Sequence, residues 1–245
     1  MRETSYRTAL VTGASSGIGA AIVRDLARRG LEVHAVARRR DALTALARET
    51  GCIAEVADVT RPEDRAALLR GFVPDILVNN AGTSRGAPLS SAAAADIDVQ
   101  VEVNLRAVLH LLNLALPRMR SRGGHVVTIG SIAGLHPLPG SPVYAATKAA
   151  IHAMHGALRL ELVGSRVRLT EICPGRVDTE IFGHAAGDAA KGRAQFLDGY
   201  EVLRPEDVAA AVWYAVSQPP NVNVGLIELT PTLQAVGGLQ TLKPQ

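Results

Sequence analysis

Apolar residues follow two spacings along this chain, and the two spacings alternate. Short apolar runs of strand length are separated by longer stretches in which apolar residues recur at helical spacing. In the stretch 18–29, for example, Ile22, Val23 and Leu26 fall on one side of a helix. Strands are predicted at 8–12, 32–37, 52–56, 75–79, 124–129, 167–172 and 225–229. Helices are predicted at 18–29, 41–50, from 60 onward, at 93–116, 142–163 and 204–217.

This alternation of strands and helices predicts the class of fold. Repeated β-α-β units place strands in parallel, and right-handed crossovers put helices on both faces of the sheet. We therefore expect an α/β fold with a doubly wound, mostly seven-stranded parallel sheet of Rossmann type. No linker or repeat divides residues 1–245, so we expect a single domain that both binds a dinucleotide and carries the catalytic groups.

Several helix starts have their own local signals. Thr60 and Glu63 have the spacing of a capping box, with Pro62 near the first helical position. Asp41 is expected to cap the helix 41–50, and Ser141 precedes a proline at the start of the helix 142–163.

The segment between the sixth strand and the last helix has no clear period. It is long and rich in glycine, and a long irregular stretch inside one domain commonly forms a lid over a binding site. We expect a substrate lid at 176–203, although a loose surface excursion is the simpler alternative. Phe182 and His184 lie within it.

Composition narrows the class of partner. Of the 245 residues 47% are apolar, 20% charged and only 3% aromatic, and the net charge is +3. The scarcity of aromatic residues argues against a stacking surface for nucleic acid, and no charge-free run is long enough to cross a membrane. Cys52 and Cys173 alone form neither a disulfide framework nor a zinc site. We expect a soluble, cytoplasmic protein.

A glycine-rich turn joins the first strand to the first helix. Such a turn lets the backbone approach a phosphate closely, and the free N–H groups of the following helix attract an anion. The glycines have the spacing G-x-x-x-G-x-G, which is informative at this position of a β-α-β unit. The candidate pyrophosphate-binding residues are Gly13, Ser15, Ser16, Gly17, Ile18 and Gly19.

The end of the second strand indicates which dinucleotide is bound. An acidic residue there would hold the adenosine ribose of NAD, but this position is Ala37, followed by three arginines. Guanidinium groups suit a 2′-phosphate, and arginines just before a helix start oppose the helix dipole unless an anion is present. Arg38 and Arg39 therefore predict NADP as the cofactor; a solvated basic turn is the alternative.

Further motifs follow in order, each at a predicted strand end or on a predicted helix. They are Asp58-Val59, Asn79-Asn80-Ala81-Gly82, Asn104, Ser131, Tyr144-x-x-x-Lys148 and Pro174-Gly175. With these motifs and the glycine turn, the chain from Thr8 to about Leu229 resembles the short-chain dehydrogenase/reductase family, in its compact single-domain branch. The short stretch Ile227 to Gln234 is similar to the NADP-dependent 3-hydroxy acid and serine dehydrogenase subgroup.

The resemblance implies roles for residues that line the cofactor. Asp58 and Val59 would hold the adenine ring. The backbone of Asn80, Ala81 and Gly82 would line the adenosine side. Near the nicotinamide the expected contacts are Pro174, Gly175, Val177 and Thr179.

The resemblance also implies hydride transfer between an alcohol and its ketone or aldehyde, with Tyr144 as the acid or base. Tyr144 and Lys148 share one helix face. Lowering the pKa of a tyrosine by 2 to 3 units needs about 3 to 4 kcal/mol. An ammonium at ~4 Å supplies about 4 kcal/mol at an effective dielectric of ~20. We therefore expect Lys148 to lower the pKa of Tyr144.

Two more residues complete the expected catalytic set. Ser131, at the end of the fifth strand, can donate a hydrogen bond to the substrate oxygen. By resemblance, Lys148 also holds the nicotinamide ribose, and Asn104 holds a water that links Lys148 to solvent. An asparagine within a helical run is disfavoured by propensity, which fits a functional position.

The substrate is a small-molecule carbonyl or alcohol in this interpretation. Its candidate neighbours are Arg85, His136, Arg176 and Phe182, with the segment 132–143 forming an apolar wall. If Arg176 points inward, a hydroxy or keto acid is reasonable; if it points outward, a neutral ketone is equally suitable. The seven histidines show no metal-binding pattern, so no metal site is predicted.

Two alternatives remain open from the sequence, and a third is disfavoured. A β-ketoacyl thioester reductase would use the same chemistry, and a non-catalytic NADP-binding sensor would use only the cofactor site. A nucleotide-sugar epimerase uses a similar Tyr–Lys pair but has an added sugar-binding domain. The family resemblance also implies a homodimer or homotetramer, and apolar residues on several sides of the helices 93–116 and 142–163 suit contacts between subunits.

Overall fold

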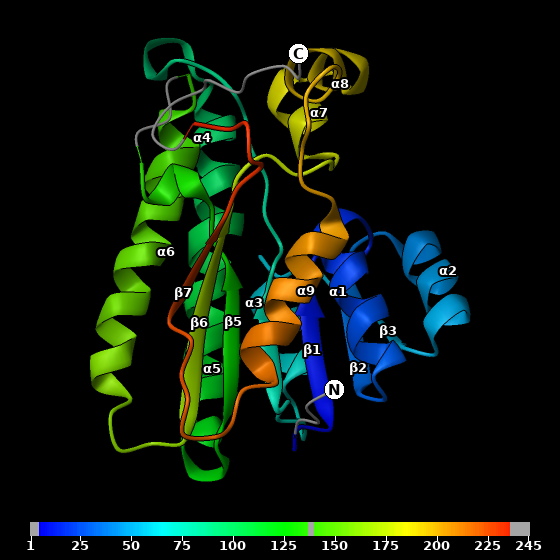
Figure 1. Ribbon diagram of the computed structural model, residues 1–245, viewed down its shortest axis with the longest axis vertical. Coiled ribbons are helices and arrows are strands. Elements are labelled where there is room, and N and C mark those ends of the chain that lie inside the picture. Colours follow the sequence, from blue (N-terminus) through cyan, green and yellow to red (C-terminus); the bar gives the residue numbers. More distant parts are fainter. Residues whose placement is uncertain (1–4, 137–139, 236–245) are drawn as a thin grey trace.

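The computed structural model describes residues 5–136 and 140–235. Within these residues, seven parallel strands form one sheet in the order β3-β2-β1-β4-β5-β6-β7 (Figure 1). The reversal of strand order beside β1 is that of a doubly wound fold, so the predicted fold class is confirmed. The strands are β1 (Thr8–Thr12), β2 (Glu32–Ala37), β3 (Ile53–Val56), β4 (Ile76–Asn79), β5 (Gly124–Ile129), β6 (Val167–Pro174) and β7 (Leu226–Leu229).

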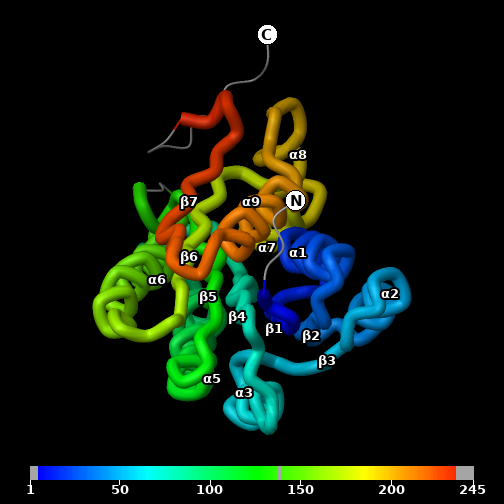
Figure 2. The backbone as a smooth tube through the Cα atoms, turned by 60° about the horizontal axis from the view of Figure 1, so that its bottom comes forward, coloured from blue at the N-terminus to red at the C-terminus, as the bar shows by residue number. Residues whose placement is uncertain are grey.

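Helices cover both faces of the sheet, and Figure 2 shows the two groups on opposite sides. Side chains alternate along each strand: Ala9 and Val11 pack under α1 and α9, whereas Leu10 packs under α5 and α6. Each face therefore has its own apolar core. The helices are α1 (Gly17–Arg28), α2 (Arg40–Thr50), α3 (Pro62–Leu68), α4 (Ala94–Val101), α5 (Ala107–Arg122), α6 (Pro142–Glu161), α7 (Ile181–Ala186), α8 (Ala189–Phe196) and α9 (Pro205–Val216). Short 3-10 turns lie at Leu89–Ser91 and Ile132–Gly134.

Two predicted helix caps are wrong. The helix α3 begins one residue later than expected, and the hydroxyl of Thr60 donates to Asp58 Oδ1 at 2.8 Å instead of capping the helix. At α2 the capping position is Arg39, and Asp41 lies inside the first turn. In both cases a nearby side chain or the strand end sets where the helix begins. A local capping motif in the sequence does not reveal this starting point.

The predicted helix 93–116 is interrupted. It consists of α4, one π-helical turn η2 (Glu102–Arg106) and α5, which continues to Arg122. Asn104 lies in the π-helical turn. Such turns add one residue to the helix and commonly mark functional positions.

The segment 176–203, expected to be irregular, contains the two short helices α7 and α8. Its glycines permit this packing: Gly187 has a left-handed φ of 69°, and a Cβ on Gly192 would lie 2.4 Å from the Phe182 backbone. The rings of Phe182 and Phe196 stack at 5.1 Å between centroids. We call residues 176–203 the lid segment.

Most apolar residues that were assigned to subunit contacts pack inside the subunit. Val108, Leu111 and Leu112 of α5 are buried in the core beneath the sheet. On the same helix Leu109 is exposed, and at the end of α6 Leu160 is 78% exposed. No helix among the described residues is long and apolar enough to cross a bilayer.

Candidate active site

The carboxyl ends of the parallel strands meet at one edge of the sheet, beneath the lid segment. A cavity of about 850 Å³ opens there. It is lined by nearly all of the residues predicted from the sequence. The exceptions are Gly19, which is packed behind the glycine turn, Asn104, and His136.

The glycine turn is shaped for close approach of an anion. Gly13 and Gly17 have left-handed φ angles of 67° and 51°. A Cβ on Gly19 would lie 2.3 Å from the carbonyl oxygen of Gly13, so only glycine allows α1 to pack against the turn. Asn80 Nδ2 donates to Thr12 O at 2.9 Å and holds the turn in place. The first N–H groups of α1 have no side-chain cap and are free to bind a phosphate.

The arginines after β2 lie beside this turn. Arg39 donates from Nε to Ser15 Oγ at 3.0 Å and also to Ser16 Oγ. Arg38 is exposed, with Nη1 3.9 Å from Asp58 Oδ2. Guanidinium and hydroxyl groups of this kind suit a phosphate, so the donor set fits the 2′-phosphate of a dinucleotide.

Asp58 lies across the adenosine side of the cavity. Burial acts to raise the pKa of Asp58, but hydrogen bonds from Thr60 and the charge of Arg38 outweigh it and lower that pKa. The carboxylate is therefore ionised near neutral pH and accepts hydrogen bonds. Val59, the next residue, lines the same cavity.

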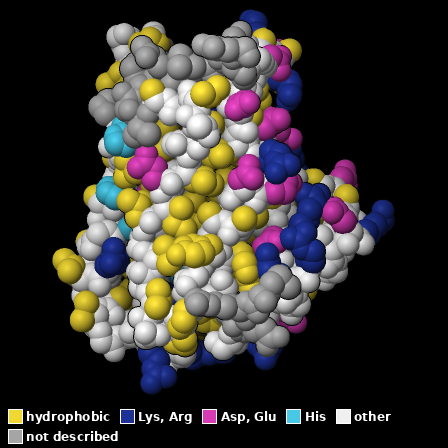
Figure 3. Space-filling model, viewed as in Figure 1, with side chains coloured by type: hydrophobic (Ala, Val, Ile, Leu, Met, Phe, Trp, Pro, Cys, Tyr) yellow, Lys and Arg dark blue, Asp and Glu magenta, His cyan; other side chains and the backbone are white. Residues whose placement is uncertain are grey.

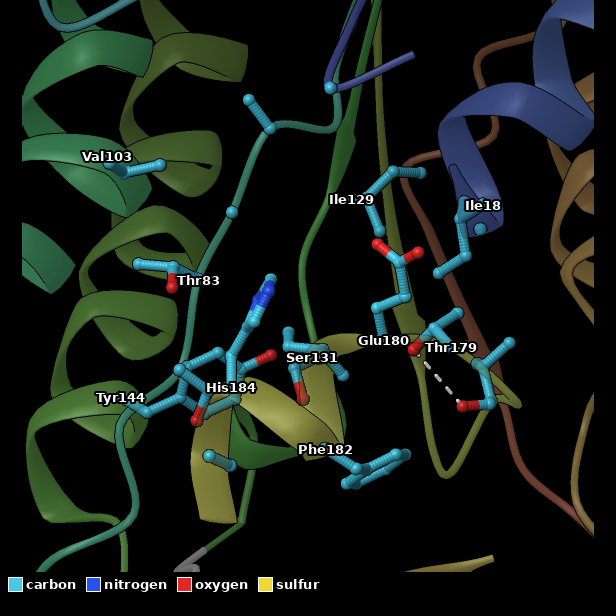
Figure 4. Close-up of a pocket in the computed structure, with 18 of the residues that line it drawn as sticks. Ile18, Thr83, Val103, Ile129, Ser131, Tyr144, Thr179, Glu180, Phe182 and His184 are labelled. Atoms are coloured by element: carbon cyan, nitrogen blue, oxygen red, sulfur yellow. Dashed lines mark hydrogen bonds between the residues drawn. The ribbon is translucent and has the colours of Figure 1, made fainter. Parts of the chain in front are cut away.

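The expected catalytic residues come together at the other end of the cavity. Ser131 follows β5, and Tyr144 and Lys148 lie one turn apart on α6. Ser131 and Tyr144 both line the cavity, and Figure 4 shows their side chains on the same side of it. Lys148 Nζ donates to Ile129 O at 2.8 Å and lies 5.7 Å from the centre of the Tyr144 ring.

The expected direction of the Tyr144 pKa shift is wrong in this structure. Burial raises the pKa of Tyr144 to about 12, although the nearby Ser131 side chain acts to lower it. Burial likewise lowers the pKa of Lys148 to about 8. Loss of water at the tyrosine sets the direction of this shift, and the ammonium group of Lys148 is turned toward Ile129 O. Tyr144 is thereby kept protonated, as a proton donor must be.

The side chain of Asn104 forms hydrogen bonds with two other segments of the protein. Its side chain accepts from Thr83 N at 2.8 Å and donates to Thr83 O and to Thr147 Oγ1. These bonds join the loop after β4 to the catalytic helix α6. The π-helical turn aims Asn104 at both partners.

Comparison with known proteins agrees with this geometry. The profile of the family described as "short chain dehydrogenase" matches residues 7–189. The chain belongs to the short-chain dehydrogenase family. It is an oxidoreductase by that membership.

Individual relatives of this dehydrogenase span its whole length. It is 40% identical over 240 residues to an uncharacterized short-chain type dehydrogenase/reductase of Sinorhizobium fredii, covering 97% of this chain and 96% of the relative. It is 35% identical to an NADP-dependent 3-hydroxy acid dehydrogenase of Escherichia coli, covering 94% and 97%. A solved structure of the closed form of serine dehydrogenase complexed with NADP⁺ has a TM-score of 0.90 and 34% identity, covering 97% and 100%.

Two arginines, Arg176 and Arg85, also line the cavity. Arg176 is 8% exposed, and its Nη1 is buried without a hydrogen-bond partner among the described residues. Its guanidinium lies 4.9 Å from the centre of the Tyr200 ring and 5.9 Å from that of Phe196. Burial lowers the pKa of Arg176. Arg85 lines the same cavity but is engaged, with Nε 3.3 Å from Asp96 Oδ1.

The other residues predicted to contact the substrate lie in different places relative to the cavity. Phe182 lines the cavity from α7, whereas His136 lies outside its lining, with Nε2 3.6 Å from Glu228 Oε1. The predicted apolar wall at 132–143 is described only in part, because Pro137, Leu138 and Pro139 lie outside the described residues.

Sequence reasoning left several lining residues without a role, among them His184 and Glu180. His184 projects from α7 toward the side of the pocket that carries Tyr144 and Ser131 (Figure 4). Glu180 precedes α7 and contacts Arg39. The only sequence signal was their position just after Thr179, because helical packing of the lid segment decides where they point. The described residues contain no group of three or more metal-ligating side chains.

Proposed function

We propose that this dehydrogenase interconverts an alcohol and its ketone or aldehyde with NADP(H), using Tyr144 as the acid or base. The observation that carries the proposal is that Ser131, Tyr144 and Lys148 line the same cavity as the glycine turn, with Lys148 Nζ 5.7 Å from the centre of the Tyr144 ring. A protein that only sensed the dinucleotide would not need this set of groups.

Two features support NADP(H) as the cofactor. Arg39 and Ser15 provide donors that suit a phosphate. Ala37 stands at the end of β2, so no carboxylate is there to hold the ribose of NAD. The solved serine dehydrogenase contains NADP⁺, and a short-chain dehydrogenase of Sphingobium yanoikuyae, with a TM-score of 0.77, is in complex with NADPH. The chemistry that the bound cofactor supplies is hydride transfer.

The side chains divide the remaining work in the direction of reduction. Ser131 donates a hydrogen bond to the carbonyl oxygen, where negative charge develops. Tyr144, with its pKa near 12, donates a proton to that oxygen. Lys148 as an ammonium ion compensates the charge left on Tyr144 and binds the nicotinamide ribose. In the direction of oxidation the same proton returns to Tyr144.

For the substrate we propose a small hydroxy acid or the matching keto acid. A buried guanidinium with an unused N–H is costly unless an anion reaches it, and Arg176 is such a group. A carboxylate would satisfy it. The relative from Escherichia coli is named for 3-hydroxy acids, which agrees with this proposal.

The test is NADPH consumption by the purified protein across a panel of keto acids, semialdehydes, neutral ketones and β-ketoacyl thioesters. We expect turnover of a keto acid or semialdehyde, and loss of about 10²–10⁴ in kcat for Tyr144→Phe with NADPH binding retained. Preference for a thioester would favour the alternative reductase activity. Tight NADPH binding without turnover of any panel member would contradict the enzymatic proposal and favour a sensor.

We also propose that the protein forms a homodimer or homotetramer. On the face in Figure 3, apolar side chains spread across the middle and charged ones gather toward the α2 side. Tyr214 of α9 is 56% exposed, and Leu226 of β7 is also exposed. Leu160 and Val163 lie at the end of α6, so there are two apolar faces, as a tetramer requires. Light scattering that shows only a 25.7 kDa species would overturn this proposal.

We propose that the cavity and the lid segment belong to one domain.

We also propose that the protein is cytoplasmic. Both Cys52 and Cys173 are buried free thiols, which suits a protein of the reducing cytoplasm.

A further inference from the structure

The carboxyl group of Glu180 connects the lid segment to the glycine turn. Glu180 Oε2 lies 3.0 Å from Arg39 Nη1 and accepts a hydrogen bond of 3.0 Å from Ser16 Oγ. Burial acts to raise the pKa of Glu180, but the hydrogen bond from Ser16 and the charge of Arg39 outweigh it and lower that pKa. The group is therefore an anion at neutral pH.

This anion occupies the donors that suit a phosphate. Arg39 is expected to hold the 2′-phosphate of NADP(H), and Ser16 lies beside it in the glycine turn. One carboxylate oxygen uses both of these donors. A phosphate oxygen on the same two donors would lie where Glu180 Oε2 now lies. Two anions at that separation repel each other, so the phosphate and the carboxylate exclude one another.

The position of Glu180 in the chain gives this exclusion a consequence for the substrate pocket. Glu180 is the residue that precedes the first turn of α7, and α7 carries Phe182 and His184 into the cavity. Figure 4 shows Glu180 and Thr179 on the Ile18 side of the pocket, with Phe182 and His184 farther along it. Displacement of the carboxylate therefore frees the start of this helix from its contact with Ser16 and Arg39.

We propose that Glu180 competes with the 2′-phosphate of NADP(H) for Arg39 and Ser16, so that binding of the phosphate releases the lid segment from the glycine turn. NAD(H) has a hydroxyl group in place of the phosphate and leaves the contact intact. Glu180 is thus a specificity-determining residue that couples the choice of cofactor to the lid segment. This inference rests on NADP(H) as the proposed cofactor.

The first experiment measures binding by calorimetry, with NADPH, NADH and 2′,5′-ADP as probes. Glu180→Gln keeps the shape of the side chain and removes its charge. We expect it to bind NADPH and 2′,5′-ADP about twofold to tenfold more tightly than the unaltered protein, the range in which surface ion pairs contribute. NADH affinity should change by less than about twofold. Glu201→Gln removes the same charge from an exposed residue outside the cavity lining and should change none of these affinities.

A double-mutant cycle identifies the contact responsible. In an Arg39→Ala background, Glu180→Gln should tighten NADPH binding much less than it does in the unaltered protein, because only Ser16 is then left as a shared donor. Weaker or unchanged NADPH binding by Glu180→Gln alone would overturn the proposal. If the unaltered protein binds no NADPH, the proposed cofactor itself is wrong; if it binds NADPH but the variant does not bind it more tightly, only the competition is wrong.

The second experiment reads the lid segment directly. Lys191 and Arg193 are exposed on α8 and are sites for trypsin. The probe 2′,5′-ADP carries the phosphate but no nicotinamide, so it cannot contact the lid segment through that ring. We expect it to accelerate cleavage at these sites, whereas 5′-AMP does not, and we expect Glu180→Gln to be cleaved faster without any probe. Equal cleavage with and without 2′,5′-ADP would contradict release of the lid segment.

Discussion

Lys148 donates a hydrogen bond of 2.8 Å from Nζ to the carbonyl oxygen of Ile129, the last residue of β5. This bond turns the ammonium group away from water and toward the strand that carries Ser131. Lys148 is 6% exposed, and burial lowers its pKa to about 8. The bond therefore orients the charge, and burial makes it titratable near physiological pH.

The first prediction concerns the pH dependence of reduction. Below pH 8 Lys148 is an ammonium ion, and above it the group loses the charge that supports Tyr144. We expect kcat/KM for NADPH-dependent reduction to fall as the pH rises through about 8. Tyr144 stays protonated over this range because its pKa is about 12. A profile that is flat up to pH 10 would contradict the role of Lys148.

The second prediction concerns stability. A lysine whose pKa is lower in the folded than in the unfolded protein destabilises the fold at neutral pH, by about 3 kcal/mol for a shift from 10.5 to about 8. Lys148→Met removes that cost but leaves Ile129 O without its donor, which costs about 1 kcal/mol. We expect the variant to be inactive yet more stable by about 1–3 kcal/mol at pH 7 in urea unfolding. The advantage should shrink between pH 8 and 10.5, where the unaltered protein loses the buried charge; a variant less stable at pH 7 would refute this explanation.

The third prediction separates acidic from neutral substrates. Arg176→Met should raise KM for a keto acid about tenfold to a hundredfold, because a buried charged hydrogen bond is lost. KM for a neutral ketone should stay within about threefold. Steady-state kinetics with both substrates measures the difference, and Arg193→Met, at an exposed lid arginine, provides the control. Equal effects on both substrates would mean that Arg176 supports the lid segment instead of binding a carboxylate.

The fourth prediction compares two glycines in helices. Gly19→Ala places a Cβ 2.3 Å from Gly13 O and should lower stability by about 1–3 kcal/mol, as overpacking does, and weaken NADPH binding. Gly156→Ala in α6 meets nothing within 4 Å and should raise stability by about 0.5–1 kcal/mol through helix propensity. Thermal unfolding of both variants, with NADPH titration, tests the pair. Similar behaviour of the two would show that the turn at Gly13 tolerates a side chain.

Some features of the lid and the catalytic helix could not have been predicted from local patterns. The glycines of 176–203 suggested an irregular segment, but Gly192 is required by the close approach of α8 to Phe182. Likewise, the helical spacing at 93–116 predicted one helix, whereas a π-helical turn adjusts its phase so that Asn104 meets Thr83 and Thr147. Each feature depends on contacts between distant segments.

The sequence by itself determined the order of strands and helices, the parallel sheet and the positions of Gly13, Ser131, Tyr144 and Lys148. It could do so because apolar periodicity sets each element and parallel strands bring their carboxyl ends to one edge. Only the tertiary structure decided the raised pKa of Tyr144, the unused N–H of Arg176 and the contact of Glu180 with Arg39. These three features depend on burial and on which groups meet across the cavity. Burial and these contacts arise only when the lid segment packs over the sheet.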